Sequence, residues 1–314
     1  MSSTPASGLP SSVRIREVGP RDGFQNEPEV IATADKVRLI ELLAAAGLKR
    51  IELTGFVRSD VIPQLADADQ VLEAVRLPDD VSVSVLVPNE RGLERALRHR
   101  PRVHEISGFL SASETHNDKN LGRPIRESLA GLERTFARAG GEGLRCEGVI
   151  SVSFGCPYEG RVSTPRVLEI AERLVAGGAR EIAFGDTTGM ANPLAVGELF
   201  LAAREALGDV ELTAHFHNSR GQGLANVLAA LQAGIRSFES SFGELGGCPA
   251  PIVPRTAAAA GNIATEDLVS MLHEMGIETG IDLGSLIEAS RAAERVLDRR
   301  LGSRVLSAGP VDWR

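Results

Sequence analysis

Two histidines separated by one residue offer the clearest chemistry in this sequence. His215 and His217 flank Phe216 in a segment with strand character. Residues two apart in a strand point to the same face, so both imidazoles are expected on one side. Two imidazoles turned into a protein interior are costly to bury without a partner, and a metal ion is a natural partner. The alternative is a pair of hydrogen-bonded core histidines, and we favour the metal because both rings share the face.

An Arg–Asp pair follows the first strand-like segment, in the run GPRDG at residues 19–23. The carboxylate of Asp22 can ligate a hard cation, and the guanidinium of Arg21 can hold an anionic oxygen of a substrate. The alternative is a structural ion pair at the end of the strand. The residues alone leave both interpretations open.

Three other polar residues occupy comparable places. Glu52 is expected to point inward from a strand, where its carboxylate needs a cation such as Arg21. It is either part of an inert ion pair or a catalytic group. Asp186, at the end of another strand, is either an acceptor for a ligating histidine or a turn former. Asn262 shortly precedes a helical segment and is interpreted, from its residue type, as a helix cap.

A glycine-rich stretch after the last strand-like segment carries a thiol. Gly246 and Gly247 permit backbone shapes closed to other residues, so we expect a flexible loop with Cys248 at its tip. The stretch lacks GxGxxG spacing, which argues against a dinucleotide site.

The elements that must position these residues alternate regularly between strand and helix. Strands are predicted at 13–19, 50–56, 81–87, 103–109, 146–154, 181–185, 211–217 and 237–242. Helices are predicted at 33–46, 66–75, 90–97, 125–139, 165–176, 193–206, 224–233 and 266–275, with an extra C-terminal helix near 283–299. Eight units without a linker predict an α/β fold, a (β/α)8 TIM barrel, rather than an open sheet. Chemistry in this fold sits where the strands end, which is where the residues above lie.

Composition narrows the class of protein. The 314 residues are 43% hydrophobic and carry a formal net charge of -8, so neither nucleic acid nor an anionic membrane surface is an expected partner. No apolar run approaches the ~20 residues of a membrane span. We expect an N-terminal tail at 1–12, one barrel domain at 13–300 and a C-terminal tail at 301–314. Three cysteines in so large a chain predict reduced thiols in the cytoplasm.

With these residues in view, the sequence resembles the 3-hydroxy-3-methylglutaryl-CoA lyase family of DRE-type TIM-barrel metallolyases. The resemblance runs from about residue 13 to residue 300. Its matching stretches are residues 18–27, 155–160, 185–187, 215–217, 221–226, 245–249 and 261–268.

The resemblance implies a function and a site. It implies divalent-metal-dependent cleavage of an acyl-CoA thioester to acetyl-CoA and acetoacetate, late in leucine degradation, by a homodimer. It implies that Mg²⁺ or Mn²⁺ is held by Asp22, His215, His217 and Asn262. It further implies substrate contact by Arg21, a catalytic thiol at Cys248, and roles for Glu52 and Asp186.

The chain departs from the family pattern at several positions. Asn218 stands where the family often has Asp, Glu244 replaces a Gly, and Ala250 stands where an aromatic residue is usual. The run 249–260 is longer than expected. Two alternatives therefore stay open: a related metallolyase or acyltransferase for another 3-hydroxyacyl-CoA, and a catalytically silent barrel.

Overall fold

The computed structural model of the protein describes residues 8–247 and 261–312. Cys248 and the rest of the run to residue 260 lie outside the described residues, as do residues 1–7 of the predicted N-terminal tail.

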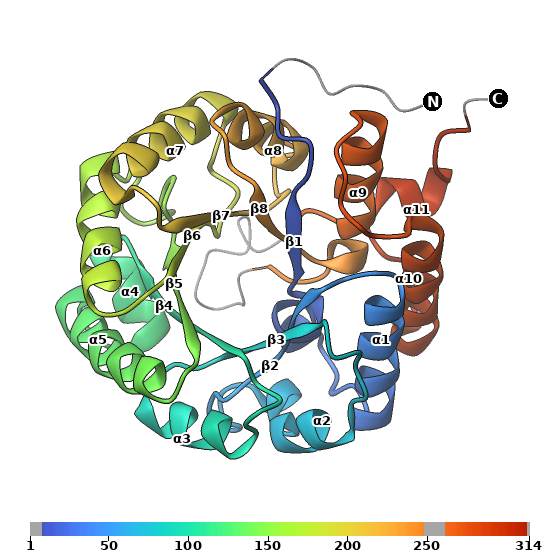
Figure 1. The fold of residues 1–314 in the computed structure, drawn as a ribbon, viewed down its shortest axis with the longest axis horizontal. Helices are drawn as coiled ribbons and strands as arrows, with labels where there is room; N and C mark the ends of the chain where they lie inside the picture. Colours follow the sequence, from blue (N-terminus) through green and yellow to red (C-terminus); the bar gives the residue numbers. More distant parts are fainter. Residues whose placement is uncertain (1–7, 248–260, 313–314) are drawn as a thin grey trace.

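Eight parallel strands form a closed barrel in which each strand pairs with its neighbours in the chain, and β8 closes the ring against β1 (Figure 1). The strands are β1 (Arg14–Glu17), β2 (Arg50–Gly55), β3 (Ser82–Leu86), β4 (Glu105–Ser111), β5 (Arg145–Ser151), β6 (Glu181–Asp186), β7 (Glu211–Phe216) and β8 (Ser237–Ser240). The predicted fold class is confirmed.

Helices surround the barrel and cover the apolar outer faces of the strands (Figure 1). They are α1 (Thr33–Ala45), α2 (Ala68–Ala74), α3 (Glu90–Arg98), α4 (Glu114–Leu121), α5 (Ile125–Gly141), α6 (Thr164–Ala176), α7 (Pro193–Leu207), α8 (Gly223–Gln232), α9 (Thr265–Glu274), α10 (Leu283–Leu297) and α11 (Arg304–Ala308). The predicted extra C-terminal helix corresponds to α10. Across the described ranges, no helix is long and apolar enough to cross a membrane.

Two helices, α4 and α11, were not predicted from the sequence. The short helix α11 lies within the segment expected to be a tail, and Asp267 of α9 anchors its start. The Asp267 carboxylate accepts hydrogen bonds from the Ser303 hydroxyl at 2.7 Å and from the backbone N–H groups of Arg304 and Val305 at 3.0 and 2.8 Å. This segment therefore packs against the barrel.

The barrel interior holds a buried cluster of charges rather than only branched apolar side chains. Arg16 of β1 is 1% exposed and lies at the centre of the cluster. Its guanidinium donates hydrogen bonds to four carboxylates from four strands: Glu105, Glu147, Glu181 and Glu239. A buried guanidinium needs such partners, because an unpaired charge in the interior carries a large desolvation cost.

The first strand is shorter than predicted. β1 ends at Glu17, and the next residues form the π-helical turn η1 (Gly19–Gly23). Pro20 has no backbone N–H, so it cannot continue the ladder of strand hydrogen bonds. The turn places Arg21 and Asp22 at the mouth where the strands end.

Candidate metal centre

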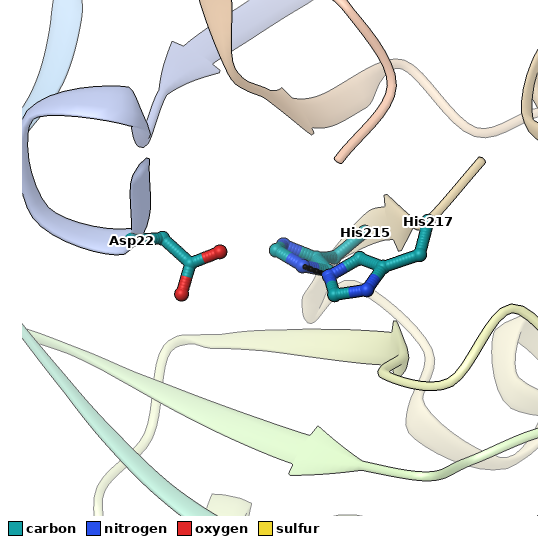
Figure 2. Close-up of side chains that lie close together, drawn as sticks. All are labelled: Asp22, His215 and His217. Atoms are coloured by element: carbon teal, nitrogen blue, oxygen red, sulfur yellow. Dashed lines mark hydrogen bonds between the residues drawn. The ribbon is translucent and has the colours of Figure 1, made fainter. Parts of the chain in front are cut away.

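Three side chains from opposite ends of the chain meet at the mouth of the barrel. Asp22 comes from η1, His215 from β7, and His217 from the residue just after β7. One ligand atom from each lies within 4.8 Å of the others, and Figure 2 shows the carboxylate facing both imidazoles. The two Nε2 atoms are 3.1 Å apart. The three groups form a cluster that can hold a metal ion.

Asn262 completes the cluster. Its Nδ2 donates hydrogen bonds to Asp22 Oδ2 at 2.7 Å and to the Leu245 carbonyl at 3.0 Å. Its interpretation as a helix cap is wrong: α9 begins at Thr265 with Ala264 as its N-cap, and the Asn262 side chain turns towards Asp22 instead.

The donor set fits a divalent cation. Oδ1 of Asn262 is buried and has no hydrogen-bond partner within the part of the chain that the structure describes. Such a carbonyl oxygen carries a desolvation penalty unless a cation or a donor meets it. With one carboxylate and two imidazoles beside it, the set offers the mixed oxygen and nitrogen ligands that suit Mg²⁺, Mn²⁺ or related ions.

A glycine permits this close packing. Gly246 has a φ of +102°, which L side chains rarely adopt. A Cβ at this position would lie 2.6 Å from Asn262 Nδ2 and 3.0 Å from Asp22 Oδ2. A larger residue at this position would therefore force the Asn262 side chain or the backbone of residue 246 to shift.

The protonation states differ within the cluster. Burial acts to raise the pKa of Asp22, but the nearby charges of Arg21 and His215 hold that pKa below its usual value. Burial lowers the pKa of His217 to about 3, and the adjacent His215 acts in the same direction. The pKa of His215 is raised, because the hydrogen bond and charge of Glu239 outweigh its burial. Asp22 is therefore anionic and His217 neutral near pH 7, which are the forms that ligate metals.

Arg21 connects the cluster to a second carboxylate. Its Nη1 donates to Asp22 Oδ1 at 2.7 Å, and its Nε donates to Glu52. The other oxygen of Glu52 accepts a hydrogen bond from the Ser107 hydroxyl. Glu52 thus pairs with Arg21, as the sequence predicted, and holds one edge of the guanidinium.

Asp186 forms hydrogen bonds within its own turn. One carboxylate oxygen accepts the backbone N–H groups of Met190 and Ala191, at 2.7 and 2.9 Å. The other oxygen, Oδ2, is buried and lacks a partner among the described residues. Burial raises the pKa of Asp186 to about 7 despite the two backbone hydrogen bonds. Of the two interpretations of Asp186, these backbone contacts agree with the turn former.

The carboxylate beside the His215 imidazole is Glu239, which sequence reasoning missed. Its Oε2 lies 2.8 Å from His215 Nδ1, and its side chain is buried. The sequence did carry a signal, since Glu239 is a charged residue in the middle of a predicted barrel strand next to the histidine strand. A carboxylate at an inward position there has to find a proton donor.

Two of the departures from the family pattern contact one another. Asn218 Nδ2 donates a hydrogen bond to Glu244 Oε1 at 2.7 Å. The backbone N–H of Asn218 also donates to the Gly261 carbonyl at 3.1 Å, next to Asn262. The pair therefore joins the residue after His217 to the chain on both sides of the segment that carries Cys248.

The fold and the cluster together define a class of protein, a barrel enzyme with a candidate metal centre at the C-terminal ends of its strands. The family model described as HMGL-like matches residues 12–292. The chain belongs to the HMGL-like family, and it is a carbon–carbon lyase.

Full-length relatives agree with this assignment. The chain is 43% identical over 298 residues to hydroxymethylglutaryl-CoA lyase of Bacillus subtilis, covering 95% of this chain and 97% of that protein. It is 44% identical over 314 residues to (R)-citramalyl-CoA lyase of Chloroflexus aurantiacus, covering 96% of each. A solved HMG-CoA lyase of Acinetobacter baumannii, in complex with coenzyme A and 3-methylmalate, superimposes with a TM-score of 0.91 at 38% identity, covering 99% of both chains.

Proposed function

We propose that the protein cleaves 3-hydroxy-3-methylglutaryl-CoA to acetyl-CoA and acetoacetate with a divalent cation, Mg²⁺ or Mn²⁺. The observation that carries the proposal is the convergence of Asp22, His215, His217 and Asn262 at the barrel mouth, with the buried Asn262 Oδ1 lacking a partner among the described residues. These four residues would hold the ion. The full-length relatives named as lyases of this thioester support the choice of substrate.

The reaction is a retro-Claisen cleavage. The tertiary hydroxyl at C3 loses its proton, the C2–C3 bond breaks, and its electron pair moves into the thioester as an enolate. A proton delivered to C2 then gives acetyl-CoA, and C3 becomes the ketone carbon of acetoacetate. A bound divalent cation polarises a hydroxyl and lowers its pKa, which favours the first of these changes.

Arg21 is the residue best placed to meet the developing negative charge. Its guanidinium is always protonated, and Glu52 and Asp22 hold it on two sides. A donor fixed in this way stabilises an enolate oxygen without reorganising during the reaction. Arg21 is therefore proposed as the contact to the thioester oxygen, with Glu52 as the residue that orients it.

The remaining assignments rest on the resemblance. Cys248 is proposed to relay a proton to C2 from its loop. Asp186 is proposed as a catalytic carboxyl. Its Oδ2 has no hydrogen-bond partner among the described residues, and its pKa is raised, and both properties suit proton transfer. A homodimer in the cytoplasm is proposed on the same ground, with one barrel domain at 13–300.

The test is a coupled assay for acetoacetate. Chelator-treated protein is supplied with Mg²⁺, Mn²⁺ or Zn²⁺ and 3-hydroxy-3-methylglutaryl-CoA, with His217→Ala as the matched inactive control. We expect activity only when an ion is added and only in the unmodified protein. Release of acetyl-CoA from the (R)-citramalyl thioester without acetoacetate from the first substrate would reassign the substrate. No turnover of any acyl-CoA with any of these ions would refute the proposal.

A further inference from the structure

We propose that Glu239 is a positioning residue that fixes the tautomer of His215, so that the lone pair of Nε2 faces the ion, and that Arg16 holds the Glu239 carboxylate in place for this purpose. The inference rests on the metal centre of the proposed function and assigns two residues outside that centre.

The strand register brings the three residues into one row. His215 of β7 is the Cα partner of Glu239 in β8, and Glu239 is the Cα partner of Arg16 in β1. All three side chains are buried and contact one another in sequence. Glu239 Oε2 lies 2.8 Å from His215 Nδ1, and Glu239 Oε1 accepts a hydrogen bond from Arg16 Nη1 at 2.9 Å.

The direction of each hydrogen bond in this row follows from chemistry. A guanidinium only donates, and an ionised carboxylate only accepts. Because Arg16 donates to one oxygen of Glu239, the other oxygen accepts from Nδ1–H of His215. The form of an imidazole that binds a metal is neutral and carries a single N–H, so with the proton on Nδ1 the lone pair of His215 lies on Nε2. The row therefore prepares His215 as a ligand through Nε2, the atom that faces His217 Nε2 at 3.1 Å.

Burial makes the row rigid. Arg16 is 1% exposed and Glu239 is 4% exposed, so water does not compete for these hydrogen bonds. Arg16 is itself held on its other side by Glu105 and Glu181. The charge cluster in the barrel interior thus extends to the metal centre through a single carboxylate.

The variant Glu239→Gln tests the direction of the hydrogen bonds that join Arg16, Glu239 and His215. An amide at this position has one acceptor and one donor end. Arg16 can only donate, so the amide oxygen turns to Arg16 and its NH2 group turns to His215 Nδ1. That arrangement requires Nδ1 to accept and places the proton on Nε2, which blocks the lone pair needed by the metal. We expect Mn²⁺ affinity to fall about 10–100-fold, the usual effect of losing such a partner.

The variant Glu147→Gln is the matched control. Glu147 is 2% exposed and also accepts a hydrogen bond from Arg16, but its side chain has no hydrogen bond to His215 among the described residues. Burial raises the pKa of Glu147 well above its usual value, despite the charge of Arg16, so an amide imitates its neutral form closely. We expect its Mn²⁺ affinity to stay within about twofold of the unmodified protein, well short of the loss that follows removal of a supporting partner.

The experiment is a Mn²⁺ titration of the full-length, chelator-treated protein and both variants, with circular dichroism to confirm folding. A large loss in Glu239→Gln alone supports the inference. Unchanged affinity in Glu239→Gln, or an equal loss in both variants, would overturn it. If the unmodified protein binds no Mn²⁺, the metal centre of the proposed function fails as well, so the two failures are distinguishable.

A second measurement reads the position of the proton directly in the unmodified protein. Long-range 1H–15N spectra of the Mg²⁺-loaded protein report which nitrogen of each imidazole carries the proton, and the chain has only 6 histidines. Loss of one signal set in His215→Gln assigns the ring. We expect the proton of His215 on Nδ1; a proton on Nε2 would refute the inference.

Discussion

Asn262→Asp is a sharp test of the metal centre, because it changes one atom and leaves the shape unchanged. In the unmodified protein Nδ2 donates to Asp22 Oδ2 at 2.7 Å and to the Leu245 carbonyl at 3.0 Å. An oxygen in its place turns both contacts into contacts between acceptors, and one of them sets two carboxylates against each other. Without an ion, the variant is expected to be less stable.

The size of the effect follows from the two lost hydrogen bonds. One links neutral groups and the other has a charged acceptor, so together they are worth about 2–4 kcal/mol. For a domain of this size that corresponds to a fall in melting temperature of roughly 3–6 °C. A bound cation turns the contact between the two carboxylates from destabilising to stabilising, because the additional carboxylate attracts the cation. Mn²⁺ at about 100 times its Kd adds about 2.7 kcal/mol to the unmodified protein, and it should add more to the variant.

The assay is thermal unfolding of both proteins in chelator and in excess Mn²⁺. Asn117→Asp is the matched control, because Asn117 is also buried and its Nδ2 also donates to a backbone carbonyl, that of Arg123, at 2.7 Å. We expect its loss of stability to be the same with and without Mn²⁺. If the loss in Asn262→Asp is likewise independent of Mn²⁺, then Asn262 is not coupled to the ion and our reasoning is wrong.

Three further outcomes are expected. His217→Ala should abolish both Mn²⁺ binding and acetoacetate release, while Cys248→Ala should keep Mn²⁺ and lose turnover; equal loss of Mn²⁺ in both would contradict this division of roles. Arg21→Lys keeps the charge but loses the planar fork that reaches Glu52, so kcat/KM should fall about 100-fold while Mn²⁺ affinity, read by titration, changes little. Burial raises the pKa of Glu17 from 4.5 to about 8, so the folded state binds more protons than the unfolded chain between these values and stability declines as the pH rises through that window. Glu17→Gln should flatten this decline in melting temperatures measured from about pH 5 to 8, and a slope as steep as that of the unmodified protein would count against the assignment.

Local patterns in the sequence were sufficient to predict the barrel. Strand segments with β-rich composition alternate with helical segments eight times. Because the connections between consecutive parallel strands are short, few arrangements of the strands in a sheet are possible. The inward direction of His215 and His217 also follows from the sequence, because alternation along a strand is a local property. The Arg21–Glu52 pair was predictable in the same way, since Glu52 points inward from the strand next to the one that Arg21 follows.

Other features depended on contacts that no local pattern encodes. Asn262 looks like a helix cap when only its neighbours are considered, and the position of Asp22 decides its direction. The role of Glu239 depends on the register in which β8 lies between β7 and β1. A shift of one residue would turn its side chain to the outer face.

The strand periods and the turn residues that end each strand are properties of short stretches of chain, and the sequence alone determined them. Closing the barrel brings residue 16 beside residue 239, and residue 22 beside residue 262. Only the tertiary structure decided which buried charge meets which partner, because desolvation penalises every unpaired group and the closed ring allows few pairings.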